Sequence, residues 1–141
     1  MKNKLAFLVL TVFIMLSLSG CGEEKKPVPE GNLKVTVTYW NGWEPDYESP
    51  VEEYYFDVKT SDTIVVEGYM TGDFSFKIKR ASKEEIIVKS EHPLEINNSY
   101  GINLQSNQRE FTVKFGEPLS LVTLTMDAGT FYTFEICEYG E

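Results

Sequence analysis

The sequence predicts an all-β protein, an antiparallel β-sandwich of immunoglobulin-like or jelly-roll type. Two observations predict this fold. Short runs with alternating apolar and polar residues recur from Leu33 to the end, separated by turn signals, and no window of twelve residues after the first twenty has a clear apolar stripe of helical period. A partly closed barrel is the alternative. The Cys-Trp-Cys arrangement of antibody domains is absent, so the likeness is architectural and implies no function.

The expected strands of the first half each have one apolar face, as half-buried strands require. The turn Thr71-Gly72-Asp73 joins the last two of them into a hairpin. Their inward residues are Leu33, Val35, Val37 and Tyr39, then Tyr54, Phe56 and Val58, then Ile64, Val66 and Met70, and finally Phe74, Phe76 and Ile78.

Further strands are expected in the second half, ending with a hairpin of LSLVTLTM and TFYTFEI around Asp127-Ala128-Gly129. Gly129 is expected to take the positive φ of a tight turn. The other expected strands centre on Ile86 and Val88, on residues 94–96 after Pro93, on Ile102 and Leu104, and on Phe111, Val113 and Phe115.

The first twenty residues have the order of an export signal: Lys2 and Lys4 precede a short apolar run, Leu5 to Leu16. That run is shorter than the roughly 20 residues that a transmembrane helix needs. The following Leu18-Ser19-Gly20-Cys21 resembles the lipobox of bacterial lipoproteins. The resemblance implies cleavage before Cys21, a diacylglycerol and often a further acyl chain such as palmitate on that cysteine, and placement on the extracytoplasmic face of the cell membrane. An ordinary cleaved signal and an uncleaved anchor are the alternatives.

Three regions follow from this pattern. Residues 1–20 form the signal peptide, residues 21–32 a flexible tether rich in charge, Pro and Gly, and residues 33–141 one β-sandwich domain. The length after the tether suffices for one core and not for two ordinary domains. A tether of this length keeps the domain close to the membrane.

The charge and the cysteine content limit which partners and which disulfide bonds are expected. Without residues 1–20, eleven Lys and Arg face twenty-two Asp and Glu, a net charge of −11. The cations are scattered along the sequence, so we expect no nucleic-acid partner and favour a cationic one. If Cys21 is acylated, Cys137 has no disulfide partner, and we expect it to be a half-buried side chain on the last strand.

The sequence lacks the usual constellations of catalytic residues. The only histidine, His92, lies in an expected turn, and the motifs of activated nucleophiles, zinc sites and phosphate loops are absent. The adjacent acids Glu52-Glu53 and Glu84-Glu85 would point to opposite faces of a strand, which disfavours a catalytic carboxylate pair. We therefore expect no enzyme activity, cofactor or metal site, although a carboxylate-dependent hydrolase and a weak calcium site remain alternatives.

One stretch, residues 39–56, holds both tryptophans and no Lys, Arg or His. Alternation assigns Tyr39, Tyr54 and Phe56 to the core, and the prolines Pro45 and Pro50 predict an exposed loop. The remaining side chains are the candidate ligand site, an aromatic surface ringed by acids that could hold Lys and Arg or stack on sugars. Its residues are Trp40, Trp43, Glu44, Asp46, Tyr47, Glu48 and Tyr55, with Glu52 and Glu53 beside them.

These expectations define a binding or accessory module that is anchored through a lipid on Cys21. Its expected partner is a cationic peptide or envelope protein, as for an immunity, inhibitor or sensor lipoprotein. A structural subunit of an envelope complex is the first alternative. A carbohydrate-binding module, with ligand stacked on Trp40 or Trp43, is the second.

Overall fold

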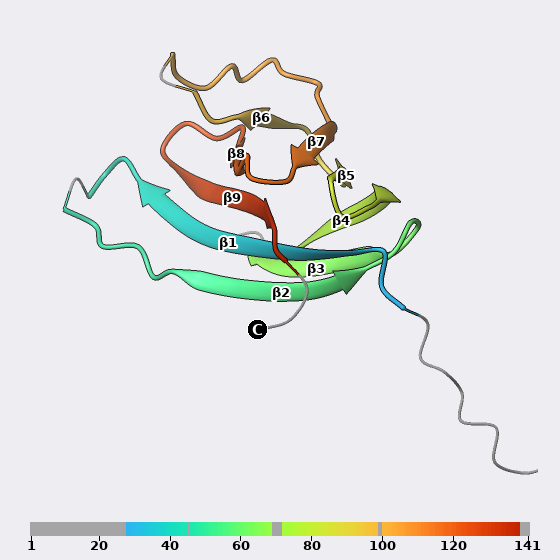
Figure 1. Ribbon diagram of the computed structural model, residues 1–141. Helices are drawn as coiled ribbons and strands as arrows, with labels where there is room; N and C mark the ends of the chain where they lie inside the picture. The colour runs from blue at the N-terminus through green and yellow to red at the C-terminus, as the bar shows by residue number, and fades with distance from the viewer. Residues whose placement is uncertain (1–27, 45, 69–71, 99, 139–141) are drawn as a thin grey trace, which may run out of the picture.

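Two antiparallel sheets pack face to face, without closing into a barrel, and confirm the predicted β-sandwich (Figure 1). The computed structural model describes residues 28–44, 46–68, 72–98 and 100–138. The signal peptide and Cys21 therefore lie outside the described residues, as do Pro45 and Met70. Sheet A has the strand order β2-β1-β9-β8-β6 and sheet B the order β3-β4-β5-β7. The strands are β1 (Gly31–Asn41), β2 (Glu52–Val58), β3 (Thr63–Gly68), β4 (Gly72–Ala81), β5 (Glu85–Ser90), β6 (Leu94–Ile96), β7 (Glu110–Lys114), β8 (Leu119–Thr123) and β9 (Ala128–Ile136).

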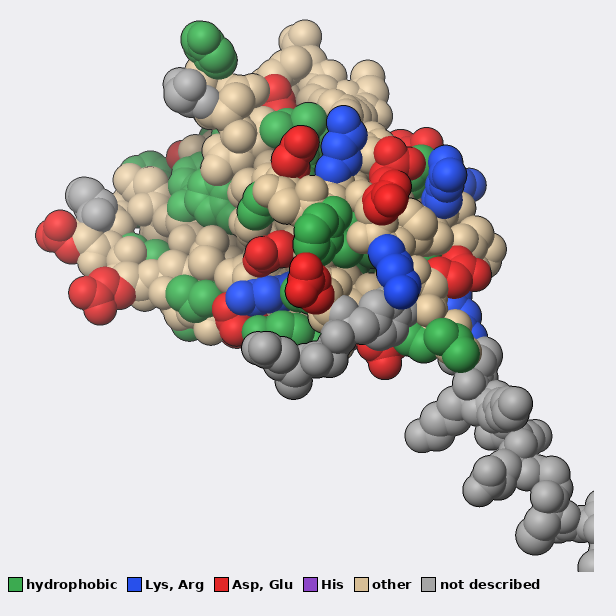
Figure 2. All heavy atoms as spheres, in the orientation of Figure 1, with side chains coloured by type: hydrophobic (Ala, Val, Ile, Leu, Met, Phe, Trp, Pro, Cys, Tyr) green, Lys and Arg blue, Asp and Glu red, His purple; other side chains and the backbone are tan. Residues whose placement is uncertain are grey.

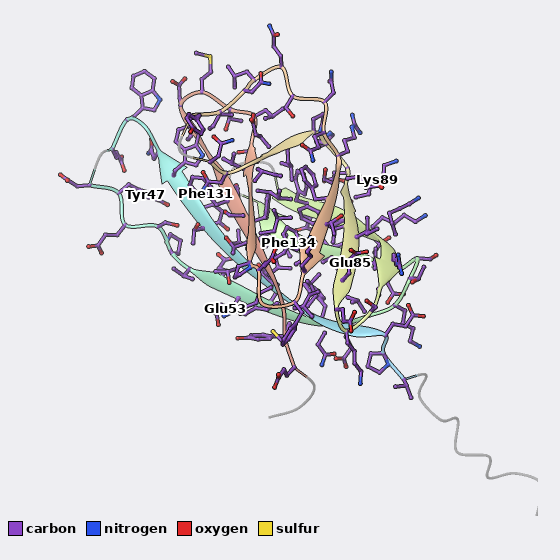
Figure 3. All side chains as sticks on the ribbon, turned by 45° about the horizontal axis from the view of Figure 1, so that its top comes forward. Tyr47, Glu53, Glu85, Lys89, Phe131 and Phe134 are labelled. Carbon is purple, nitrogen blue, oxygen red and sulfur yellow. The ribbon has the colours of Figure 1, made fainter. Side chains whose placement is uncertain are left out.

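Alternating apolar residues of both sheets form one core, because successive side chains of a strand point to opposite faces. Three aromatic residues lie at its centre. Phe76 of sheet B contacts Phe134 and Tyr132 of sheet A, with ring centroids 4.9 Å and 5.3 Å apart. Figure 3 shows Phe134 between the sheets. Tyr39, Tyr54 and Phe56 pack against the core, as the alternation predicted.

The strand predicted around Ile102 and Leu104 is wrong, because residues 100–109 form no strand. Side-chain oxygens in and next to this segment accept hydrogen bonds from nearby backbone amides, which competes with strand pairing. The Oδ1 of Asn98 accepts from Tyr100 N at 3.0 Å, and that of Asn103 accepts from Gln105 N at 3.1 Å. Gly101 has a φ of 94°, which takes the backbone out of the extended region.

Two positions near strand ends also differ from prediction. Phe115 does not join the core and is 49% exposed. β7 stops at Lys114, and Gly116, with a φ of 75°, reverses the chain toward β8. The predicted hairpin is confirmed as β8 and β9, but Gly129 is not its turn residue: it lies inside β9, opposite Trp40.

The fold has two distinct ends, and β1 connects them (Figure 1). At the end where β1 begins, a Glu30 carboxylate oxygen accepts hydrogen bonds of 2.8 Å from both the amide and the hydroxyl of Thr60. We call this the tether end, because residues 21–30 precede it. β1 begins at Gly31, two residues before its expected start. At the other end, the distal end, β1 passes into the connection to β2.

Candidate functional site

The connection between β1 and β2 lies at the distal end, and we call its described residues, 42–44 and 46–51, the acidic aromatic loop. Its first residues are tied to Asn41 and to the β8–β9 turn: Trp43 N donates to Asn41 Oδ1 at 3.0 Å, and Gly42 N donates to the carbonyl of Asp127 at 2.6 Å. Its last residues are tied back to β1, since Tyr39 N donates to Ser49 Oγ at 2.6 Å. A loop held in this way has less conformational freedom to lose on binding.

The acidic aromatic loop presents an unusually open indole among carboxylates. Trp43 is 76% exposed, and Glu44, Asp46 and Glu48 are all exposed. Among the residues that the structure describes, these three carboxylates form no ion pair. Figure 2 shows acidic side chains projecting at the left end, where Figure 1 places this loop, and no Lys or Arg is visible there. Of the predicted site residues, Trp43, Glu44, Asp46, Tyr47 and Glu48 belong to this loop.

Other carboxylates reach the same end from neighbouring strands. Glu67 and Asp73 are opposite each other at the end of the β3–β4 pair, and Glu67 N donates to the Tyr54 hydroxyl at 3.4 Å. The Tyr54 hydroxyl in turn donates to Glu52 at 2.8 Å. Burial, together with the negative charge of Glu52, raises the pKa of Tyr39 to about 12. The distal end thus concentrates negative charge well beyond the loop itself.

Trp40 lies apart from this loop surface, on the outer face of sheet A, where it contributes to a hollow of about 270 Å³. Figure 3 shows Phe131, another of its lining residues, beside the end of β1. The register agrees, because Phe131 is opposite Thr38 on β1 and opposite Val122 on β8. We call this the Trp40 hollow; its lining residues are Trp40, Asn97, Asn98, Ile102, Val122 and Phe131, with Gly101 at its rim.

The position of the Trp40 ring depends on a glycine. A Cβ built on Gly129 would lie 2.6 Å from Trp40 Nε1 and would also collide with the hydroxyls of Thr123 and Thr125. Trp40 Nε1 is buried there and has no hydrogen-bond partner among the described residues. The indole therefore occupies the space that any larger residue at position 129 would fill.

Tyr55 is not brought together with the tryptophans. It lies on the outer face of β2 opposite Lys34, near the start of β1, whereas Trp40 lies near its end. Lys34 Nζ is 5.8 Å from the centre of the Tyr55 ring and 2.6 Å from Glu53 Oε1. The hydrogen bond from Lys34 lowers the pKa of Glu53, and the bond to Glu53 raises that of Lys34. Tyr55 and Glu53 thus belong to a separate local cluster.

The sequence reasoning missed most residues of the Trp40 hollow. The available signal was the pair of adjacent apolar residues in Leu121-Val122 and Phe131-Tyr132, because one of two neighbours on a strand must point outward. The local sequence does not predict that Asn97, Asn98 and Ile102 line this hollow, because their positions depend on how the β6–β7 loop folds over sheet A. Figure 1 shows this loop projecting beyond β6.

The positions of the positively charged side chains also differ from the expectation. Several that are far apart in the sequence are neighbours in the structure. Lys77, Lys89 and Lys114 lie on the outer face of sheet B, and Lys77 is directly opposite Lys89. Figure 3 shows Lys89 and Glu85 on this side of the molecule. Arg80 of the same sheet is 3.7 Å from Glu85. The acidic aromatic loop lies outside this mixed-charge face, whereas Glu67 and Asp73 lie on the same outer face of sheet B.

Cys137 follows β9 directly and is half-buried, as expected, with its amide donating to Asn32 O at 3.0 Å. It lines a hollow of about 460 Å³ at the tether end, together with Tyr55 and Asp57. The chain leaves this hollow toward residues 139–141, which lie outside the described part. His92 is exposed, and the centroid of its ring lies 6.0 Å from that of the Phe74 ring.

Across the described ranges, no three His, Cys, Asp or Glu side chains are grouped to hold a metal ion. The same residues include no helix that could cross a membrane. In comparisons with known proteins, no family model, curated protein or solved structure matches this chain. The function must therefore be argued from the geometry of the distal end.

Proposed function

We propose that the protein is a lipid-anchored, extracytoplasmic module that binds a cationic segment of a peptide or another protein and catalyses no reaction. The observation that carries this proposal is the acidic aromatic loop, where exposed Trp43 is accompanied by carboxylates that form no ion pair with any described residue and the backbone is tied by hydrogen bonds at both ends. Lys and Arg fit such a surface, because they can pair with carboxylates and lie against an indole face at the same time. An immunity, inhibitor or sensor lipoprotein would use such a surface.

The charge of the whole distal end supports the same partner chemistry. Glu52 lies directly after the loop, at the start of β2, and Glu67 and Asp73 are opposite each other near the end of the β3–β4 pair, on the outer face of sheet B. A surface with one sign of charge accelerates encounters with oppositely charged partners, and salt screens this effect over about 8 Å at physiological ionic strength. The proposed binding should therefore weaken as salt is added.

The test is to neutralise the loop without changing its shape. We expect the triple variant Glu44→Gln, Asp46→Asn, Glu48→Gln to bind the capped peptide acetyl-KKSKK-amide about 3- to 100-fold more weakly than the wild type at low salt, because three exposed ion pairs are lost. Titration of the tryptophan fluorescence of the detergent-solubilised full chain measures the affinity.

A matched variant controls for net charge. Asp57→Asn, Glu84→Gln, Glu117→Gln removes the same charge from exposed positions at the tether end. We expect this variant to retain nearly all of the affinity. An equal loss in both triple variants, or binding that does not respond to salt, would contradict the proposal.

A further inference from the structure

The Trp40 hollow adjoins the acidic aromatic loop only where the loop begins, at Gly42, and its chemistry differs from that of the loop. A Cβ built on Gly42, the first residue of the loop, would lie 3.7 Å from the six-membered ring of Trp40. The Gly42 amide also joins the loop to the β8–β9 turn. A segment bound across the loop would therefore pass the mouth of the hollow.

The lining of the Trp40 hollow is mainly apolar and carries no charge among the described residues. Trp40, Ile102 and Phe131 are half-buried and Val122 is 1% exposed, so these side chains present hydrocarbon to the space. Among the described lining residues, Asn97 and Asn98 carry polar amide side chains. Apolar walls with a few polar groups at the rim are typical of sites that take an apolar group and orient it by hydrogen bonds.

The size of the hollow limits what it can accept. Its volume of about 270 Å³ lies at the lower end of the range for small-molecule sites, which is roughly 300 to 1,000 Å³. This space suits a single large side chain rather than a stretch of chain. In protein interfaces, one apolar side chain buried in a pocket often supplies much of the affinity while the surrounding charges supply steering.

We infer that the bound cationic segment carries one large apolar side chain, which inserts into the Trp40 hollow while its positive charges meet the acidic aromatic loop. This inference rests on the proposed function, because that proposal requires the partner to carry positive charges. Asn97 and Asn98 then hydrogen-bond to the backbone of the segment on either side of the inserted side chain. Insertion buries hydrocarbon, so this contribution is insensitive to salt.

The two tryptophans allow each contact to be followed separately, because the chain has no others. Trp43→Phe leaves Trp40 as the reporter of the hollow, and Trp40→Phe leaves Trp43 as the reporter of the loop. Titrations of the detergent-solubilised full chain use acetyl-KKLKK-amide, acetyl-KKSKK-amide and the neutral probe N-acetyl-leucinamide. The two peptides carry the same charge and differ only in the central side chain.

We expect the leucine peptide to bind about 10- to 100-fold more tightly than the serine peptide, as the burial of one leucine side chain allows. N-acetyl-leucinamide should change Trp40 emission saturably and leave Trp43 emission unchanged. Ile102→Ser should abolish the advantage of the leucine peptide. Leu104→Ser, in the same loop but outside the lining, should preserve it.

The outcomes separate this inference from the proposed function. Equal affinity for the two peptides, or no response of Trp40 to N-acetyl-leucinamide, overturns insertion into the hollow even if salt-dependent binding persists. No binding of either peptide overturns the proposed function, while the neutral probe still decides whether the hollow accepts an apolar side chain. Saturable binding of N-acetylglucosamine in place of the neutral probe would make the hollow a saccharide site and overturn the inference.

Discussion

At the residue scale, the contact between Trp40 and Gly129 separates the two tryptophans into different environments. The indole of Trp40 lies across the glycine on β9, next to the hydroxyls of Thr123 and Thr125. Trp43, three residues later, lies in the open. The sequence assigned both to one surface because it gives no sign of which residue lies opposite on the neighbouring strand. For the same reason, the sequence predicts a turn at Gly129, whereas Gly129 lies inside β9.

Gly129→Ala should destabilise the protein by about 1–3 kcal/mol, the usual cost of forcing an extra methyl group into a packed site. Urea unfolding of the variant and the wild type measures the change. In a Trp40→Ala background the added methyl group has more room, so the cost of the second substitution should fall. An unchanged cost there would show that the indole does not fill the space above Gly129.

Tyr39 provides a prediction for alkaline pH. Burial raises its pKa to about 12 from an ordinary value of 10.0, so the folded state holds the phenolic proton more tightly than the unfolded state. The resulting stabilisation is complete below pH 10 and is lost as the pH rises through 12. Tyr39→Phe should therefore make the decline in unfolding free energy across this window shallower, as measured by urea unfolding at several pH values.

Tyr55→Phe is the matched control, since Tyr55 is 66% exposed on the outer face of β2. A change of slope of the same size in both variants would show that the effect does not come from the buried position of Tyr39.

At the element scale, strands with regular alternation were predictable, and the segments that lack a pairing partner were not. β1, β3, β4 and β5 follow their apolar pattern closely, because burial of one face fixes both the period and the register. The segment 97–109 has apolar residues at Ile102 and Leu104 with the spacing of a strand. Asn98 and Asn103 accept local backbone hydrogen bonds instead, Gly101 has a positive φ, and the described residues of the segment do not pair with the edge strand β6.

A pair of leucines tests this distinction between strand and loop. Leu121 of β8 is fully buried, whereas Leu104 is 46% exposed. Leu121→Ala should cost about 2–5 kcal/mol, because it removes buried hydrocarbon and leaves a cavity. Leu104→Ala should cost less than about 0.5 kcal/mol. Thermal or urea unfolding compares the two, and similar costs would mean that the 97–109 segment contributes to the core after all.

At the scale of the whole molecule, the candidate site lies far from the tether. β1 has eleven residues, and at about 3.4 Å per residue it spans roughly 35 Å between the two ends. The sequence predicts one aromatic and acidic surface, whereas Trp40 and Tyr55 lie apart from the loop that carries Trp43, Glu44 and Asp46. The location of the site at the far end from the tether, and the addition of Glu67, Asp73 and the Trp40 hollow, follow from strand directions and sheet packing that no local pattern encodes.

The proposed anchor can be tested on the whole chain, which has only two cysteines. We expect metabolic labelling with an alkyne fatty acid to mark the wild type and Cys137→Ala, because the lipid attaches at Cys21. Cys21→Ala should remain unlabelled and should be released from the membrane fraction, since acyl chains supply the membrane affinity. Labelling of Cys21→Ala at the wild-type level would rule out the anchor.

The course of β1 also has a mechanical consequence. A partner held at the acidic aromatic loop and a lipid held at Cys21 would pull on opposite ends of this one strand. β1 is hydrogen-bonded along its length to β9 on one side and to β2 on the other. In antiparallel pairs these bonds lie perpendicular to the strand, so tension along β1 loads them together in shear rather than opening them one at a time. With the proposed ligand and anchor in place, tension between them would be carried by the whole length of β1.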